Sequence, residues 1–399
     1  MQRRELLKTF AVGSLAGAAN LHSLSFAAQP TTPLVVVFLR GGADSLHIAA
    51  PVEDRDYIAA RPPELRILSS GATPGIRLPK GFATELDCRI HPAAAPLLDL
   101  FQSGHAQLLH ACGLKHATRS HFVAQEILEA NTTSANERIL SSTPGWLTPY
   151  IKANTEKPQT LPFVATSAGQ MRSLQGLRSG LSLTGELRWG INLTGEAQAK
   201  SVLESLYGGT STSDPLMQCA QDTLRQLSLI DSKATKTGNA IAAYTPFKDI
   251  KYNTENYEWQ HAMQTVAQLI RMDIGLQVAC VDFGGWDTHE YQTGRINNLV
   301  RQWASNVRAL FDDLQAAGKE VTIVVMSEFG RRLRSNSSNG TDHGHAGALW
   351  TLDSRRRKLL PDTQWPGLKN EQLDQGLDLQ STADVKQVLD SIARQTLMT

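Results

Sequence analysis

The sequence predicts an α/β fold in which helices cover both faces of a doubly wound, mostly parallel sheet. Short apolar runs, typical of buried strands, alternate along the 399 residues with longer amphipathic segments, typical of helices. Several apolar runs end in polar side chains that can bind metal. Because open α/β sheets bind ligands at the carboxyl ends of their strands, we expect a ligand site, and most simply a metal site, at one edge of this sheet.

Composition narrows the class of protein. The chain is 41% hydrophobic and carries a formal net charge of +1, so it can form a large packed core. A nearly neutral chain lacks the basic surface that nucleic acid or an anionic membrane requires. The four cysteines show no C-x-x-C spacing, which excludes a zinc ribbon. One disulfide is compatible with an exported protein, but the spacing does not name the pair.

Each expected element follows from local pattern. The expected strands are the apolar runs at residues 34–39, 106–110, 161–166, 275–281, 320–326 and 346–352. The expected helices lie at 92–101, from 121 onward, and at 217–230, 257–272, 297–316 and 381–396. Gly104 ends the first helix, Ser120 stands at the N-cap of the second, and Ser381 with Asp384 forms a capping pair for the last.

The N-terminus is predicted to be an export signal. Arg3 and Arg4 precede a mild apolar stretch, and small residues at 25–27 are typical of a cleavage site. The paired arginines favour the twin-arginine route, which carries folded proteins to the periplasm and uses the twin-arginine translocase as a partner. An ordinary secretory signal or an uncleaved anchor is the alternative. We expect residues 28–399 to form a single soluble domain with an insertion at about 170–215.

Two loops carry side chains suited to a metal. Asp287 and His289 follow one expected strand, and Asp342, His343 and His345 lie beyond another. Carboxylate oxygen and imidazole nitrogen together suit Zn²⁺ or Mn²⁺. Two imidazoles and a carboxylate from these loops are expected to share one ion, with His345 favoured over His343 as the inward ligand. The alternative is a hydrogen-bonded loop network without metal.

Four further charged residues lie where strands end. Glu328 can bind metal, act as a base, or pair with Arg331, and Asp44 can bind metal or cap its own turn. Arg40 and Arg331 are candidate anion clamps, because a guanidinium binds phosphate or sulfate oxygens in bidentate fashion. The residue types alone leave these alternatives open.

Ser120 is the candidate nucleophile. A helix N-terminus has unpaired amides and a positive dipole end, which favour a phosphate or sulfate there and help a hydroxyl to ionise. The alternative is that Ser120 only caps the helix. The sequence contains neither a G-x-S-x-G elbow nor a phosphate-binding G-x-x-x-x-G-K-[ST] loop, and Gly41-Gly42 does not form a dinucleotide fingerprint.

Five segments together resemble an exported bacterial family, the domain of unknown function 1501. They are FLRGGADS at 38–45, RSHF at 119–122, GWDTH at 285–289, SEFGR at 327–331 and DHGH at 342–345. A twin-arginine signal is usual in that family. The family in turn resembles the alkaline phosphatase and sulfatase superfamily, which implies an alkaline-phosphatase-like α/β domain with divalent metal held at strand ends.

The resemblance implies a role for each matching residue. Ser120 matches the nucleophile, and Asp44 matches the metal aspartate after the first strand. Asp287 and His289 match an Asp/His pair on one metal, which His343 or His345 completes. Glu328 stands where the superfamily has an Asp-His pair on a second metal. Its neighbour here is Phe329, so the pattern leaves open one ion or two.

The leading hypothesis is an exported, metal-dependent hydrolase of small anionic phosphate or sulfate esters. Ser120 would attack, and Arg40 or Arg331 would bind the remaining oxygens. The alternative is a non-catalytic periplasmic or envelope protein that uses the same fold to bind a partner. A transferase of the sugar-phosphate mutase kind is a third possibility, which export disfavours.

Overall fold

A computed structural model describes residues 32–79, 85–134, 136–154, 160–167, 169, 171–187, 196–209, 214–238 and 240–398. The predicted export signal lies outside these residues, in the unit that ends at Thr31, and only the unit that begins at Thr32 is described below. Among the described residues, no helix combines the length and the apolar character needed to cross a bilayer.

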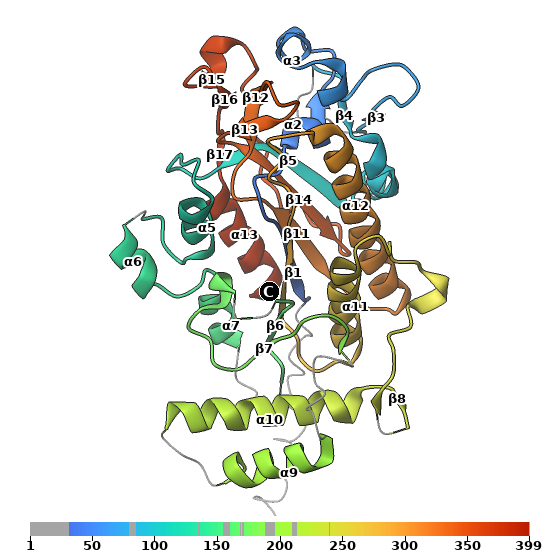
Figure 1. The fold of residues 1–399 in the computed structure, drawn as a ribbon, viewed down its shortest axis with the longest axis vertical. Coiled ribbons are helices and arrows are strands. Elements are labelled where there is room, and N and C mark those ends of the chain that lie inside the picture. Colours follow the sequence, from blue (N-terminus) through green and yellow to red (C-terminus); the bar gives the residue numbers. More distant parts are fainter. Residues whose placement is uncertain are drawn as a thin grey trace, which may run out of the picture. The chain divides into compact units, whose positions relative to one another are not determined.

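The core of the fold is an eight-stranded sheet (Figure 1). Its strands in spatial order are β17 (Ala383–Asp384), β5 (Ala106–Gly113), β14 (Gly347–Asp353), β11 (Thr322–Met326), β1 (Leu34–Leu39), β10 (Val278–Phe283), β6 (Phe163–Ala165) and β7 (Leu181–Ser182). Neighbouring strands are parallel except where β14 pairs with β11 and with β5. The predicted α/β fold with a mostly parallel sheet is therefore confirmed.

Strand β1 lies inside the sheet and is buried on both faces. Its sequence LVVVFL is buried at every position, as expected for a parallel strand covered on both sides. Val36 pairs with Cys280 of β10 on one side and with Val324 of β11 on the other. All six predicted strands form, with ends shifted by up to three residues, and β7 and β17 add short edges that the apolar pattern does not indicate.

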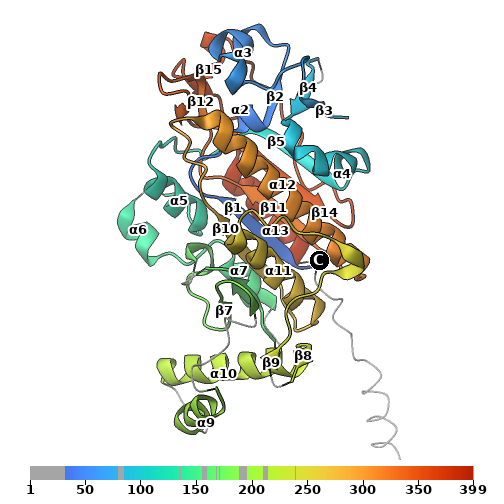
Figure 2. The same cartoon turned by 45° about the vertical axis from the view of Figure 1, so that its right-hand side comes forward.

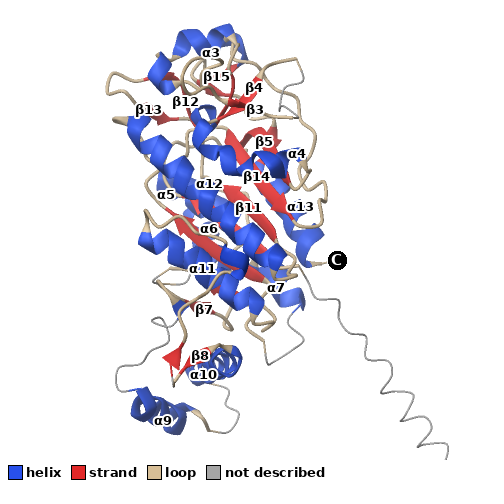
Figure 3. Cartoon of the chain, turned by 90° about the vertical axis from the view of Figure 1, so that its right-hand side faces the viewer, coloured by secondary structure: helices blue, strands red, loops and turns tan. Residues whose placement is uncertain are grey.

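Alternate residues of β1 contribute to two separate cores. Val35, Val37 and Leu39 pack under α11 (Tyr257–Arg271) and α12 (Gln292–Ala316), which lie side by side across one face (Figure 2). Leu34, Val36 and Phe38 pack under the helices of the other face: α5 (His121–Glu129), α7 (Thr148–Asn154) and α13 (Val385–Leu397). Figure 3 shows the strands behind α11 and α12. The two-residue period of a strand thus places helices on both faces of the sheet.

The remaining helices and strands complete the described chain. The helices are α2 (Ser45–Ile48), α3 (Arg55–Ala60), η1 (Pro63–Leu65), η2 (Pro92–Leu97), α4 (Leu98–Gln102), α6 (Glu137–Ser142), η3 (Arg172–Leu174), α9 (Glu196–Tyr207), α10 (Pro215–Lys233), η4 (Phe247–Asp249) and η5 (Asn370–Gln372). The strands are β2 (Ala49–Pro51), β3 (Ile76–Arg77), β4 (Cys88–Ile90), β8 (Lys236–Thr237), β9 (Ala240–Ile241), β12 (Arg331–Ser335), β13 (Thr341–His343), β15 (Leu373–Asp374) and β16 (Asp378–Leu379).

Several local expectations need correction. Ser120 occupies the N-cap of α5, but its side chain makes no capping hydrogen bond. Asp384 alone caps α13, because the Ser381 hydroxyl donates to the Ala383 carbonyl instead. The insertion at 170–215 stays a prediction; the segment contains η3, the edge strand β7 and α9, and part of it lies outside the described residues. All four cysteines are free, so the disulfide that export allows does not form here.

Candidate metal centre

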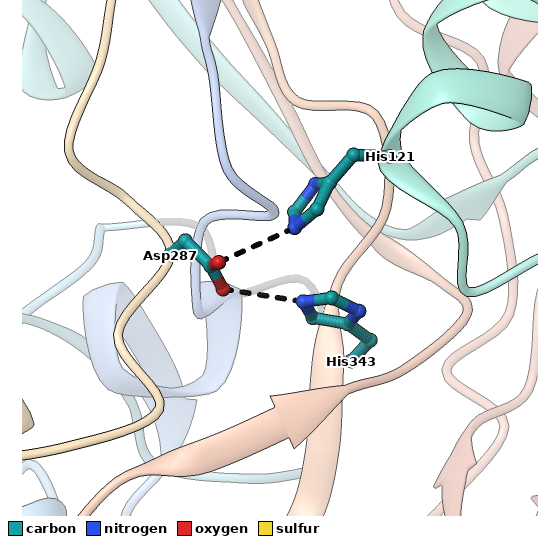
Figure 4. A group of neighbouring side chains, drawn as sticks. All are labelled: His121, Asp287 and His343. Carbon is teal, nitrogen blue, oxygen red and sulfur yellow. Dashed lines mark hydrogen bonds and ion pairs between the residues drawn. The ribbon is translucent and has the colours of Figure 1, made fainter.

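The loops that follow β1, β10 and β11 meet at one edge of the sheet. These strands are parallel neighbours, so their carboxyl ends lie together. His121 of α5, Asp287 after β10 and His343 of β13 converge there (Figure 4). One ligand atom from each lies within 4.8 Å of those from the other two. Chain segments that are far apart in the sequence therefore build one site.

Gly41 and Gly42 let the first loop approach the site. Both have left-handed backbones, with φ of 121° and 67°, which a glycine adopts without steric cost. A Cβ on Gly41 would lie 2.4 Å from the Asp287 amide nitrogen, and one on Gly42 would lie 2.3 Å from the Phe329 ring. The glycine pair is therefore required for the loops to pack this closely.

Asp287 is the shared partner of three imidazoles. Its Oδ1 lies 3.1 Å from His289 Nε2 and 3.2 Å from His343 Nε2, and its Oδ2 lies 3.5 Å from His121 Nε2. Burial disfavours its charge, but hydrogen bonds from Arg331 and His343 and the charge of Arg331 outweigh this and lower the pKa of Asp287 to about 2. The carboxylate is therefore ionised near neutral pH. We call His121, Asp287, His289 and His343 the histidine cluster.

Each ring of the histidine cluster has an acceptor at its other nitrogen. The partners are Glu328 Oε1 at 2.8 Å from His121 Nδ1, Asp342 Oδ1 at 3.1 Å from His289 Nδ1, and the Arg119 carbonyl at 2.8 Å from His343 Nδ1. An acceptor at Nδ1 favours the tautomer with the proton there, which leaves the Nε2 lone pair free. Metal-binding histidines are held in the same way by carboxylates or backbone carbonyls.

The Nε2 atoms face one another as well as Asp287. His289 Nε2 and His343 Nε2 are 2.9 Å apart, and two lone pairs at this distance repel unless a proton or a cation lies between them. Among the described residues, His121 Nε2 is one of the buried side-chain atoms without a hydrogen-bond partner. Three imidazole nitrogens and a carboxylate form a donor set that zinc commonly takes. The residues present therefore fit a divalent metal.

Arg331 holds the loops of the site in place. Its side chain is fully buried, and it donates to Asp287 and to the backbone carbonyls of Gly41, Gly42, Trp286 and Thr341. These carbonyls belong to the loops after β1 and β10 and to β13. Arg331 thus fixes the position of Asp287 from behind and is not free to clamp an anion.

A family model described as "Protein of unknown function (DUF1501)" matches residues 31–352. The chain belongs to this family. The resemblance read from the five sequence segments is thus confirmed. No curated protein matches the chain.

Solved structures with a distant likeness share very little sequence with this DUF1501 chain. The periplasmic C-terminal domain of EcEptC from Escherichia coli, in complex with zinc, has a TM-score of 0.36 and 8% identity, over 82% of this chain and 74% of that one. The alkaline phosphatase of the Antarctic bacterium TAB5 has a TM-score of 0.36 and 8% identity, over 92% and 98%. A variant of that phosphatase with magnesium bound has a TM-score of 0.39 and 9% identity. At these scores, residue roles rest on the geometry of this chain alone.

Asp44 lies outside the histidine cluster, contrary to the role that the resemblance implied. It is fully buried and forms a two-point ion pair with Arg61 at 2.8 and 3.0 Å. Gln292 donates to it at 2.6 Å, and Thr341 donates at 3.3 Å. Burial opposes the charge, but Arg61 lowers the pKa of Asp44 below its usual range. Its oxygens are therefore used by protein donors.

Glu328 supports the histidine cluster from behind. It is 2% exposed, and its Oε1 accepts from the Gly41 amide at 2.9 Å, from His121 at 2.8 Å and from Gln125 at 2.8 Å. Burial opposes its charge, yet the hydrogen bonds from His121 and Gln125 lower its pKa. The same contact raises the pKa of His121. Glu328 therefore orients the ring of His121.

His343, and not His345, lies beside Asp287. His345 is nearly buried, with Nδ1 at 2.9 Å from Asp374 and Nε2 at 2.7 Å from the Leu114 carbonyl. Both of its ring nitrogens therefore have protein partners. The structure reverses our preference for His345 because β13 ends at His343, and the following turn places the two rings in different surroundings.

Arg40 was predicted to clamp an anion, but its guanidinium is bonded within the protein. Its guanidinium donates to Glu129 at 2.7 and 3.1 Å and to Asp282 at 2.9 Å. Three nitrogens thus have carboxylate partners, which leaves no fork for a phosphate or sulfate. Burial lowers the pKa of Arg40, but these carboxylates outweigh it and raise the pKa above its usual range.

Ser120 is exposed at the start of α5, between two residues that contact the site. The Arg119 carbonyl holds His343, and His121 belongs to the histidine cluster. Sequence reasoning missed His121 as a candidate ligand. The signal available was its place at a helix start with Gln125 one turn later, since both side chains reach Glu328.

Proposed function

We propose that the protein is an exported hydrolase of phosphate or sulfate esters that depends on a divalent metal. One observation carries this proposal. Three imidazoles, each with Nδ1 held by an acceptor, direct Nε2 toward one carboxylate. Ser120 is adjacent in sequence to one of them and lies at a helix N-terminus. This combination supports a metal-assisted attack by a serine hydroxyl.

The histidine cluster would hold the ion, which we propose to be zinc or manganese. Imidazole and carboxylate donors suit both metals. Bound there, a divalent ion would stabilise negative charge on the oxygens of an ester. Both oxygens of Asp44 accept from protein donors. Glu328 accepts three hydrogen bonds at Oε1 and one from the Ser327 hydroxyl at Oε2, so we propose one ion in preference to two.

The chain itself supplies position and a nucleophile. Glu328 fixes the ring of His121, and Arg331 fixes Asp287. Ser120 makes no capping bond through its side chain, so its hydroxyl is available to attack. The first amides of α5, a nine-residue helix, favour an anionic group near its start.

Export through Arg3 and Arg4 remains part of the proposal. The pair lies outside the described residues, so its support is the sequence pattern. Replacing both with lysine is expected to leave the precursor in the cytoplasm, as measured by fractionation and immunoblotting. Normal delivery of that variant to the periplasm would overturn the twin-arginine route.

A second candidate is a non-catalytic binding protein on the same fold. Arg40 and Arg331, the predicted anion clamps, are both fully engaged by protein groups. An enzyme that handles dianionic esters commonly keeps a guanidinium free for their oxygens. This observation favours a site that has kept the metal and lost turnover.

Metal analysis and an ester panel separate the two candidates. The mature protein is assayed for bound metal by mass spectrometry, and then for hydrolysis of aryl phosphates and aryl sulfates. We expect one equivalent of metal, and we expect Ser120→Ala to lower turnover about a thousandfold or more. Ser103→Ala, at the exposed end of α4, is the matched control and should retain activity. Metal without turnover of either ester class would favour the binding protein.

A further inference from the structure

We infer that a second site, separate from the metal centre, binds an uncharged oligosaccharide along α13. Two cavities lie there, a first of about 470 Å³ and a second of about 570 Å³, which is the size range of small-molecule sites. Gln387 of α13 lines both of them. A chain of several sugar units that crosses this residue can therefore occupy the two cavities together.

The first cavity lies at the opposite end of α5 from the histidine cluster. His121 begins α5, whereas Leu128 and Asn131, at and just beyond the other end of the helix, line the cavity. Nine helical residues, at a rise of about 1.5 Å each, place these ends about 12 Å apart. No residue of the histidine cluster lines either cavity. The inference therefore goes beyond the proposed function and does not depend on a metal or on Ser120.

The first cavity combines an apolar wall with polar side chains that are free to bind. Four side chains that are at most 6% exposed form the wall: Leu128, Trp146, Tyr150 and Leu389. Three exposed polar side chains also line the cavity and have no hydrogen-bond partner among the described residues: Asn131, Thr133 and Gln387. Carboxamides and hydroxyls both donate and accept hydrogen bonds, as sugar hydroxyls do. The C–H groups of a sugar ring can pack against the apolar wall.

The charged side chains of the first cavity are bonded within the protein. The Lys386 ammonium donates to three backbone carbonyls at the C-terminal end of α5, two of them at 2.8 and 3.1 Å. Asp390 accepts from the Tyr150 hydroxyl and, at 2.8 Å, from Arg394. A charged ligand would find no free counterion here, and burial of its charge would be uncompensated. The cavity therefore favours an uncharged ligand.

The second cavity continues the same chemistry along α13. Ser391 and Gln395 line it one and two helical turns beyond Gln387, on the same face of the helix. The three charged side chains that line it also have protein partners: Lys358 and Asp362 form an ion pair, and Asp384 caps α13. Both cavities thus present carboxamides and hydroxyls, and neither presents an unpaired charge.

A peptide is the alternative occupant, and the fold offers it little edge to join. Extended peptides commonly bind by adding a strand to an exposed sheet edge. The edge strand beside the second cavity, β17, has two residues, and neither is exposed. The polar groups that are free in the cavities match sugar hydroxyls in chemistry. We therefore assign the site to a sugar chain.

Isothermal titration calorimetry tests the purified protein with three neutral hexamers, those of N-acetylglucosamine, β-1,4-linked glucose and α-1,4-linked glucose. We expect at least one hexamer to bind with a Kd of about 1 mM or tighter. Gln387→Trp places a large ring where the two cavities meet and should weaken that binding about tenfold or more. Asn131→Ala removes one hydrogen-bonding group and should weaken it about threefold.

Gln102→Trp is the matched control, since Gln102 is exposed on α4 and lines neither cavity. It should bind the hexamer as wild type does, and circular dichroism checks that both tryptophan variants are folded. Removal of metal with EDTA should leave sugar binding unchanged, so failure of the proposed hydrolysis would not affect this result.

Three results would overturn the inference. The first is that none of the hexamers shows saturable binding at concentrations up to about 10 mM, ten times the expected Kd. The second is that the folded Gln387→Trp protein binds as tightly as wild type, which would place the sugar elsewhere. The third is that hexaproline, a neutral peptide of the kind that aromatic-lined grooves bind, binds in place of the sugars.

Discussion

Asp44 and Asp287 follow neighbouring parallel strands, yet Asp44 is bonded within the core and Asp287 faces three histidines. Asp44 is fully buried, and its oxygens accept from Arg61, Gln292 and Thr341. The side chain of Asp287 is 46% exposed and faces three imidazole nitrogens. Both are aspartates two residues beyond a glycine, so residue type and spacing do not separate them. The difference lies in which donors surround each carboxylate.

The nearby histidines differ in the same way. His47 lies beside Asp44 and is 2% exposed, and burial lowers its pKa to about 3, so the ring stays neutral within the core. The rings around Asp287 are partly open to solvent and have an acceptor at Nδ1. A buried histidine that is bonded to the core stabilises it, whereas a half-exposed histidine held at one nitrogen offers the other to a ligand.

The largest effect is expected at Asp44. Asp44→Ala leaves the buried guanidinium of Arg61 without its carboxylate, which typically destabilises a fold by about 3–5 kcal/mol. Urea unfolding monitored by circular dichroism measures the loss. The double variant Asp44→Ala/Arg61→Ala should lose less than the sum of the single variants, and the folded fraction should still bind metal. A loss in the free energy of unfolding below about 1 kcal/mol would mean that the Asp44–Arg61 ion pair does not stabilise the fold.

The second effect is loss of metal at Asp287. Asp287→Asn should weaken metal binding at least about a hundredfold, since removal even of an outer partner of a metal site costs tenfold to a hundredfold. The metal-free variant should keep its fold, because the side chain is half exposed and Arg331 retains its carbonyl partners. Competition titration with a chelator measures the affinity. Asp273→Asn, which removes an exposed partner of Lys319, should change nothing, and full metal content in Asp287→Asn would refute the site.

A variant of Glu328 tests whether the acceptor that orients His121 affects metal binding. Glu328→Gln keeps the shape but replaces the charged acceptor of His121 Nδ1, so metal affinity should fall about tenfold to a hundredfold. Asp342→Asn alters the matching partner of His289, which is far more exposed, and should have the smaller effect. The same chelator titration measures both variants. Equal affinities for wild type and Glu328→Gln would show that Glu328 is not an orienting group.

The smallest change per pH unit concerns the stability of the metal-free protein in acid. The pKa of His47 is about 3 in the folded state, below its value of about 6.5 in an unfolded chain. The stability that neutral His47 provides is therefore present above pH ~6.5 and falls as the pH drops from there toward 3. Its contribution to the slope approaches about 1.4 kcal/mol per pH unit. In His47→Asn, the free energy of unfolding should depend less steeply on pH between about pH 6 and 4, as measured by urea titrations at several pH values in that range. An unchanged slope would contradict burial of the neutral ring.

The sequence by itself determined the strands and the edge of the sheet where the site forms. Apolar β-branched runs such as 34–39 and 320–326 favour strands that are buried on both faces, and the strands found there are buried at every position. Glycine and polar residues directly after these runs then have to lie at the carboxyl ends of the strands. The five segments were also enough to identify the family, because their residue types and order are specific.

Tertiary structure alone decided which polar groups form the site. His343 and His345 are two residues apart, and a turn after β13 sends one toward Asp287 and the other toward Asp374. His121 is held at the site by a hydrogen bond from its Nδ1 to Glu328, which lies more than two hundred positions later in the sequence. Arg40 and Arg331 look alike as anion clamps until their carboxylate and carbonyl partners are known. Such partners come from distant parts of the chain, and local pattern carries no information about which distant acceptor a side chain will meet.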